Sequence, residues 1–583
     1  MARSPRLIFP LLGVALAALI ALPACEQADP NSVEYQIQQL KEKKTKESIN
    51  KLGEMQAKEA VDPLMEAYDA GRFRYDIVAA LARIGDPKAA PTMIKAIGDK
   101  SEKMAAQLAG TTLLEWNVGE GNTDALLVVA QDATAPNENR YAALQLLARY
   151  PDPKAAPALL NTLKADPDLQ PMALAGLAAE ALGKLREEKA IPALVTCLWL
   201  DDALGRNAVS ECRLALNRIG PKSVPALIQA LERKNRAVEA RATKLKFDKG
   251  GIVEAKAADM LGDLPDPAAV EPLIAAMKSR DEMPPSIANN PQKAQVFVLS
   301  GVQKVISTAK ALATIGDERA VEPMLAIARD KELALEHKLS AVQQLAFLGS
   351  AKAVDGLLDI LDDAVNQYDP VSQGFRLQAA LAVANLIPAG DKKAIAKLEK
   401  TLAAIDKETK GWIEDNNKKI GEVKDANLKA GLQQDIKGWE EQQKSYAEVT
   451  AKLAVVKECG DDMGCYAGKL ADPNVAVQLL AAYRLSNAQG EGEATARAAL
   501  LDRTEAMLQK ETPTTDDPVI LNVLLFGIGR TGDASVVDRV AALQKLASDK
   551  SAASKNPMYK GAYKGVAYTL ELLAASLAHA KAG

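Results

Sequence analysis

The chain has 583 residues, more than the roughly 250 to 300 that a single hydrophobic core holds, so it forms either several domains or one repeating array. It is 48% hydrophobic but only 4% aromatic, a composition that favours closely packed helices over β-sheet. The formal net charge of -4 gives no indication of a nucleic-acid partner.

Residues 1–24 have the pattern of a secretory signal peptide. Arg3 and Arg6 precede an apolar run over residues 7–22, which is too short and too uneven in its flanking charge for a membrane span. The segment Leu22-Pro23-Ala24-Cys25 resembles the lipobox of bacterial lipoproteins. That resemblance implies cleavage before Cys25 and a lipid on its side chain. Ordinary cleavage that leaves Cys25 free and an uncleaved anchor are the alternatives.

Residues 25–49 are expected to form a tether and a first helix. The tether begins with Glu26-Gln27-Ala28 after the cysteine, rather than with the Asp that holds some lipoproteins at the inner membrane. The resemblance to lipoproteins therefore implies a cell-envelope protein anchored at the outer membrane and facing the periplasm.

A recurring block organises the chain from about residue 50 onward. A first helix ends in Leu-x-x-Ile-Gly, an Asp turn follows, and a second helix opens with a proline near its start. Gly ends a helix in a conformation that other residues avoid, Asp caps the turn, and Pro fits the first helical turn. The prolines of the copies are Pro63, Pro91, Pro157, Pro192, Pro225, Pro272 and Pro323. Their spacing indicates one helix pair every thirty-odd residues.

These units resemble HEAT repeats, particularly the short type first associated with phycobilisome lyases. The resemblance implies an all-α, HEAT/armadillo-like solenoid over residues 50–397, and a looser set of HEAT-like repeats over 459–583. Such a solenoid offers a surface for protein partners, and we expect the second helices to form its inner face. The same resemblance leaves an alternative, an accessory subunit or a lyase-type enzyme.

The interval from Pro91 to Pro157 spans two units, and two other intervals between prolines are longer than the period. The interval from Pro225 to Pro272 contains the basic cluster of the chain, which could contact anionic lipid headgroups or a negatively charged partner. A solvated, charged helix with Glu232 and Glu239 among the cations is the alternative. The cluster comprises Arg233, Lys234, Arg236, Arg241, Lys244, Lys246 and Lys249. The interval from Pro272 to Pro323 contains two proline-rich stretches within residues 283–291 and predicts a projecting loop.

From residue 398 to residue 458 the Gly-Asp-Pro pattern disappears and a charged, Gln-rich helical sequence replaces it. We predict a long, coiled-coil-like helical hairpin inserted in the solenoid. The motifs Lys410-Gly411-Trp412 and Lys437-Gly438-Trp439 lie symmetrically about residues 424 and 425, which places the two Trp side chains at similar heights on facing arms. Apolar positions are sparse, so the seam between the arms is expected to be narrow.

Export makes disulfides possible at the remaining four cysteines. Cys459 and Cys465 flank a turn-rich loop, and we predict a disulfide there; metal binding is the alternative, but no further Cys or His lies nearby. Cys197 and Cys212 fall on the apolar faces of neighbouring antiparallel helices. A bridge and two buried thiols are equally compatible with that placement.

The sequence gives little support for catalysis. His337 and His579 are its two histidines, and neither stands in a metal-binding pattern, so we predict no catalytic residue, no cofactor and no metal. Gly527-Ile528-Gly529-Arg530-Thr531-Gly532 matches a dinucleotide-binding loop by itself. Its alignment with residues 261–266 predicts an interhelical turn instead. We therefore expect a non-enzymatic scaffold or adaptor that binds protein partners.

Overall fold

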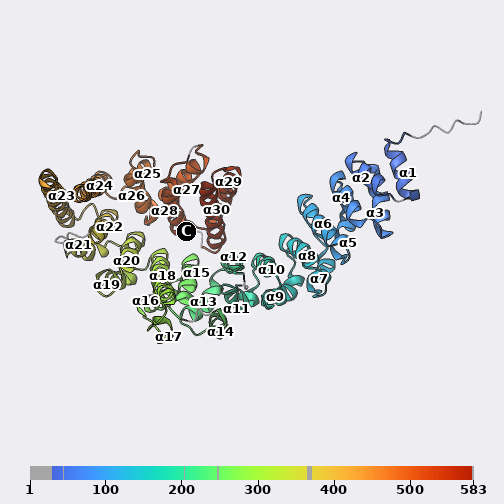
Figure 1. Cartoon of the computed structure of the whole chain (residues 1–583), viewed down its shortest axis with the longest axis horizontal. Helices are drawn as coiled ribbons and strands as arrows, with labels where there is room; N and C mark the ends of the chain where they lie inside the picture. Colours follow the sequence, from blue (N-terminus) through green and yellow to red (C-terminus); the bar gives the residue numbers. More distant parts are fainter. Residues whose placement is uncertain are drawn as a thin grey trace, which may run out of the picture. The chain divides into compact units, whose positions relative to one another are not determined.

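The computed structural model describes residues 29–43, 45–201, 204–245, 249–363, 370–511 and 513–580. Its regular elements in these ranges are helices, with one isolated antiparallel bridge between Asp201 and Asn207 and no strand. The predicted all-α solenoid of helix pairs is confirmed (Figure 1). It divides into two compact units, the first up to Leu146 and the second from Leu147 onward.

The first unit stacks helix pairs in the predicted order. Each first helix packs on the next first helix, as α2 does on α4 and α4 on α6. Its helices are α1 (Val33–Lys43), α2 (Lys46–Glu54), α3 (Val61–Asp69), α4 (Arg74–Ile84), α5 (Ala90–Gly98), α6 (Lys103–Glu115), α7 (Thr123–Gln131) and most of α8 (Asn137–Arg149).

The turn between the two helices of a pair has the predicted chemistry. At the end of α4, Gly85 adopts a left-handed φ of 73°, and the Asp86 carboxylate accepts a hydrogen bond of 2.9 Å from the backbone N–H of Lys88. Asp152, Asp266, Asp317 and Asp533 cap their turns in the same way. Short 3₁₀ turns carry these caps or their equivalents at Lys58–Ala60, Pro87–Ala89, Pro153–Ala155, Glu188–Ala190, Pro221–Ser223, Pro267–Ala269, Glu318–Ala320 and Ala534–Val536.

The second unit begins with repeats that continue this pattern. A side helix, α14, follows α13, and a short helix, α17, precedes the long α18. The helices as far as the hairpin are α9 (Ala156–Lys164), α10 (Met172–Lys184), α11 (Ile191–Cys197), α12 (Val209–Ile219), α13 (Val224–Leu231), α14 (Arg236–Leu245), α15 (Ile252–Asp263), α16 (Val270–Lys278), α17 (Pro285–Ala288), α18 (Pro291–Ile315), α19 (Val321–Arg329), α20 (Leu335–Leu348), α21 (Ala353–Asp363) and α22 (Pro370–Leu386).

The predicted hairpin consists of α23 (Lys392–Glu422) and α24 (Ala426–Cys459). The ring centroids of Trp412 and Trp439 lie 5.8 Å apart across its seam. The structure refines its boundaries, because the lower halves of both helices also serve as repeat helices: α23 packs on α21, and α24 packs on α22 and α26. The hairpin is therefore built from two lengthened repeat helices, and the array continues through it.

The array ends with α25 (Met463–Lys469), α26 (Val475–Ser486), α27 (Gly492–Gln509), α28 (Asp517–Thr531), α29 (Val537–Ala553) and α30 (Pro557–Leu577). These repeats belong to the same compact unit as residues 147–397. The Gly-rich segment at 527–532 is helical as far as Thr531, so only Gly532 and Asp533 form the predicted turn. Gly527 lies inside this helix. Glycine is required there because a Cβ would collide with the Ser486 hydroxyl on α26.

The first helices of the second unit form a closed ring. Each packs on the next from α15 through α18, α20, α22, α24, α26 and α28 to α30, and α30 packs in turn on α12. An ion pair between Arg213 and Asp263 joins α12 to α15. Figure 1 shows α28 and α30 opposite α12, α15 and α18. The expectation that second helices form the inner face was therefore wrong for this unit, because the turn pattern defines a helix pair but not the direction in which the array curves.

Candidate binding site

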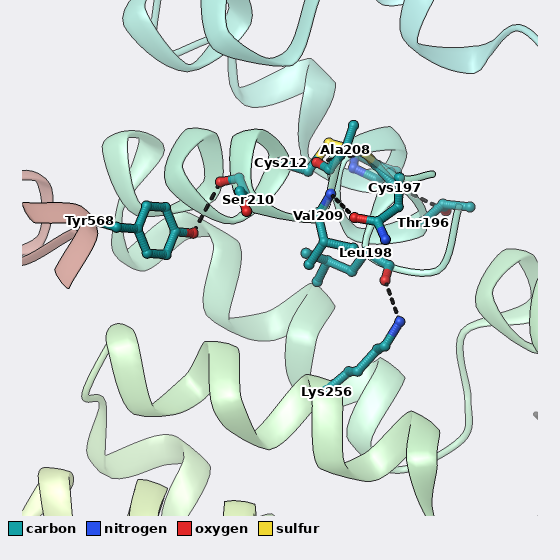
Figure 2. The surroundings of a disulfide bond; sticks show 11 residues. Thr196, Cys197, Leu198, Ala208, Val209, Ser210, Cys212, Lys256 and Tyr568 are labelled. Atoms are coloured by element: carbon teal, nitrogen blue, oxygen red, sulfur yellow. Dashed lines mark hydrogen bonds between the residues drawn. A yellow bond between two sulfur atoms is a disulfide. The ribbon is translucent and has the colours of Figure 1, made fainter. Parts of the chain in front are cut away.

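The closure of the ring depends on polar contacts between α30 and α12. The Tyr568 hydroxyl donates a 3.2 Å hydrogen bond to the carbonyl of Ser210, in the first turn of α12 (Figure 2). At the other end of α12, the Arg218 guanidinium lies 3.0 Å from the Glu571 carboxylate. The His579 Nε2 lies 2.9 Å from the Arg218 carbonyl oxygen. Both ends of α12 are thus held by residues more than 350 positions away along the chain.

Two further side chains from the last repeats bind the C-terminal ends of first helices. The Arg530 guanidinium on α28 donates to the carbonyl oxygens of Phe347 and Leu348, at 2.9 and 3.1 Å, where α20 ends. The Arg484 guanidinium on α26 donates to the Ile387 carbonyl at 2.6 Å, just after α22. Carbonyls at a helix C-terminus carry partial negative charge and lack partners within the helix, so cations stabilise them.

The turn glycines provide the space for these contacts. A Cβ on Gly316 would lie 2.6 Å from an Arg530 nitrogen, and one on Gly220 would lie 2.6 Å from the His579 Nε2. At Gly85, the equivalent position in the first unit, a Cβ would meet nothing within 4 Å. In the second unit these glycines therefore allow the left-handed turn and also leave room for side chains of the last repeats to pack against it.

A cavity of about 490 Å³ lies between the two sides of the ring. One wall comes from α12, α15, α18 and α20 and carries most of the charged groups. The other wall comes from α28 and α30 and is largely apolar. The polar wall includes Arg213, Asp259, Asp263, Ser307, Lys310 and Gln344, and the apolar wall includes Leu525, Phe526, Leu572, Leu573 and Leu577.

The polar wall carries two positive and two negative side chains, of which Arg213 and Asp263 form an ion pair. The Arg213 guanidinium makes a two-point ion pair with the Asp263 carboxylate, one bond of which measures 2.7 Å. Burial works against the charge of Arg213, but Asp263 raises its pKa above the usual range. Burial raises the pKa of Asp259, while a hydrogen bond from Ser307 and the charges of Arg213 and Lys310 act in the opposite direction.

Cys197 and Cys212 are joined by a disulfide, with their Cα atoms 6.2 Å apart. It links the end of α11 to the first turns of α12, next to the Ser210 carbonyl that Tyr568 binds (Figure 2). Lys256 also holds the loop that the bridge spans, because its ammonium donates a hydrogen bond of 3.1 Å to the Leu198 carbonyl. The bridge therefore fixes α12, the helix on which the ring closes.

Cys459 and Cys465 are also joined by a disulfide, with a Cα separation of 5.4 Å. It connects the end of α24 to α25 across the predicted turn. There the Tyr466 hydroxyl donates a hydrogen bond of 3.1 Å to the Gly460 carbonyl. Cys25, the predicted lipidation site, lies outside the described residues.

The structure distributes the basic cluster among separate contacts. Arg233 pairs with Glu239 at 2.6 Å, and Lys234 lies 2.9 Å from Glu232. Arg241 is buried and donates to the carbonyls of Trp199 and Asp201, which anchors the loop before α12. Lys244 lies 2.9 Å from Asp168. Arg236 begins α14, Lys249 lies just before α15, and Lys246 lies outside the described residues.

The predicted loop after α16 contains α17 and leads into the exposed first half of α18. Val296, Val298 and Leu299 on α18 are 61%, 48% and 56% exposed. Among the described helices, α18 alone is long and apolar enough to cross a membrane. Its second half packs against α15, α16 and α20, which is the position of a core helix.

Two family models match segments of the chain. Residues 123–213 match the family model described as HEAT repeats, and residues 73–99 match that of the PBS lyase HEAT-like repeat. These two segments of the chain contain HEAT repeats. No curated protein matches the chain.

Among solved structures, Kap121p bound to Ste12p is similar over 94% of this chain and 75% of its own, at 13% identity and a TM-score of 0.30. Importin beta in a polyethylene glycol condition is similar over 93% and 81%, also at 13% identity and a TM-score of 0.30.

The cavity was not predicted from the repeat pattern of the sequence. Its walls come from segments about 300 residues apart, and the repeat pattern does not pair them. The sequence did contain one local indication of a polar site. Asp259 and Lys310 are charged residues next to the buried faces of first helices. In the described part of the chain, no group of three or more His, Cys, Asp or Glu could hold a metal ion.

Proposed function

We propose that the chain is a lipid-anchored scaffold or adaptor of the bacterial cell envelope, held at the outer membrane through Cys25 and facing the periplasm. It binds protein partners on the surface of its HEAT-repeat solenoid and performs no catalysis. The observation that carries the proposal is the array of stacked helix pairs, an architecture whose usual task is to present an extended binding surface. The two disulfides support an oxidising compartment.

The structure narrows the choice of partner surface in the second unit. Its last repeats cover much of the inner side of its first helices. The second helices and the outer part of the hairpin remain for partners. Residues 417–441 of the hairpin are mostly exposed, and Leu428 near its tip is 55% exposed. We assign the hairpin tip as a contact surface.

The anchor is tested by Cys25→Ser. We expect the substituted protein to lack the lipid and to move from the membrane fraction to the soluble periplasmic fraction, because no other acylated residue is proposed. Fractionation and intact mass measure the two effects. If the variant remains in the membrane fraction, the lipid anchor on Cys25 is wrong.

The partner surface is tested by cross-linking and affinity capture from envelopes. The deletion must spare the lower hairpin, since α23 and α24 belong to the ring there. Removing residues 413–422 and 426–435 together shortens both arms by the same number of residues and retains the turn at 423–425. We expect a protein partner with the whole chain and its loss with the shortened one. Recovery of no protein partner with either form would contradict the scaffold.

A further inference from the structure

The cavity at the ring closure has the size and construction of a small-molecule site. Its volume of about 490 Å³ falls within the roughly 300 to 1,000 Å³ usual for ligand pockets. It lies between repeats at the two ends of the ring, so a bound molecule would contact both. This property goes beyond the binding of protein partners and does not depend on it.

The two walls differ in chemistry. Leu572 and Leu573 on α30, with Phe526 on α28, form an apolar surface. Ser307 on α18 and Asp259 on α15 lie on the opposite, polar wall. A ligand that satisfies both walls must be amphipathic, because burying a polar group against the leucines without a hydrogen bond is unfavourable.

The balance of charge selects the ligand further. Asp263 is already paired with Arg213, and Lys310 and Asp259 contribute opposite charges to the same wall. The four charged side chains of the wall therefore sum to zero, and the wall offers no net charge to a ligand ion. A charged headgroup would lose its hydration and meet a wall of zero net charge, where each attractive group is accompanied by a repulsive one, so an uncharged headgroup is favoured.

Two side-chain amides are placed to recognise such a headgroup. Gln344 on α20 and Asn522 on α28 line the cavity from its two sides. Within the described residues, neither side chain makes a hydrogen bond. An amide both donates and accepts, as does a ligand hydroxyl, and it needs no charge.

We propose that the cavity between α12, α15, α18 and α20 and the last helices α28 and α30 binds an uncharged amphipathic molecule. Its hydroxyl groups contact Gln344 and Asn522, and its hydrocarbon part lies against Leu572, Leu573 and Phe526. Because the molecule contacts both sides of the ring, its binding stabilises ring closure.

The test uses the full mature chain with Cys25→Ser and the uncharged fluorescent probe N-phenyl-1-naphthylamine. We expect saturable binding at one site per chain. Monodecanoylglycerol, below its critical micelle concentration, should displace the probe at a concentration at least about tenfold lower than decanoate or decylamine does. It should also raise the thermal unfolding midpoint progressively with its concentration. Displacement by decanoate or decylamine at an equal or lower concentration would overturn the uncharged class.

Thr569→Trp places a large ring in the cavity from an exposed position on α30, and should abolish probe binding. Its matched control is Thr111→Trp, at an exposed threonine of α6 that makes the same bond to a carbonyl four residues earlier. The control should bind the probe as the parent does. Equal probe binding by Thr569→Trp and the parent, or no saturable binding by the parent, would overturn the site.

A second variant separates the site from any effect on folding. Gln344→Leu with Asn522→Leu removes both amides but keeps the apolar wall. We expect probe binding to persist and the affinity for monodecanoylglycerol to fall by about tenfold, as the loss of two hydrogen bonds implies. An unchanged affinity for monodecanoylglycerol would overturn the role of the amides.

Discussion

Lys452 on α24 places an ammonium group in the core of the second unit, where the side chain is 3% exposed. Its Nζ donates a 2.9 Å hydrogen bond to the Asn385 side chain, and the ring of Tyr483 lies 6.0 Å away. Burial lowers the pKa of Lys452 from 10.5 to about 8. The folded chain therefore releases this proton at a lower pH than the unfolded chain does.

This difference predicts a rise in stability with pH. Between pH 8 and 10.5 the unfolded chain binds more protons at this site than the folded chain, so the free energy of unfolding increases with pH there. Urea unfolding at pH 7.5 and 9.5 should show a contribution of about 2 kcal/mol from Lys452, which Lys452→Met removes. Lys444→Met, at an exposed lysine on the same helix, should leave the increase intact. The same increase in Lys452→Met as in the parent would contradict the prediction.

At the scale of elements, the helix ends show what local sequence can predict. Asp86 and Gly85 form the expected turn because their interactions are with the adjacent backbone. In the copy of the repeat that contains Pro192, the glycine of the block is Gly183, so the pattern predicts a helix end there. Gly183 instead lies inside α10, and Arg186 takes the left-handed conformation, with φ 51°. The reason is tertiary, since a Cβ on Gly183 would lie 2.6 Å from the Cα of Ala215 on α12. A glycine required for close packing and one required for a turn have the same appearance in a sequence.

The disulfides give a prediction at the same scale. Cys197 and Cys212 are 15 residues apart and fix α11 to α12, whereas Cys459 and Cys465 are six apart. Replacing the first pair by alanine should lower the free energy of unfolding by about 3 kcal/mol, and replacing the second by about 2 kcal/mol. Urea unfolding of the oxidised proteins measures both losses. With a reductant present throughout, the variants and the parent should become similar in stability, and a loss that persists would point to packing instead.

The whole second unit differs from an open solenoid in one physical respect. In an open array each repeat contacts only its neighbours, so a change at one end affects the adjacent repeats. Here α30 contacts α29 in the sequence order and α12 across the ring. That closure could not be predicted from the repeat pattern, because Tyr568 and Ser210 form their bond 358 positions apart. The cavity exists because of the same closure, and it could not be predicted because its walls are also far apart in the sequence.

Ring closure predicts that a local change in α30 affects α12. Replacing Tyr568, Glu571 and His579 by alanine removes the three side-chain contacts to α12 and leaves the extensive packing of α30 on α29. Amide hydrogen exchange should then become faster in Val209–Ile219 as well as in α30, because both ends of α12 lose a partner. The Cys197–Cys212 bridge should limit the effect at the first turns of α12. The largest increase is therefore expected near Ile219, where Arg218 loses its partner Glu571. Faster exchange confined to α28–α30 would show that the last repeats behave as the end of an open array.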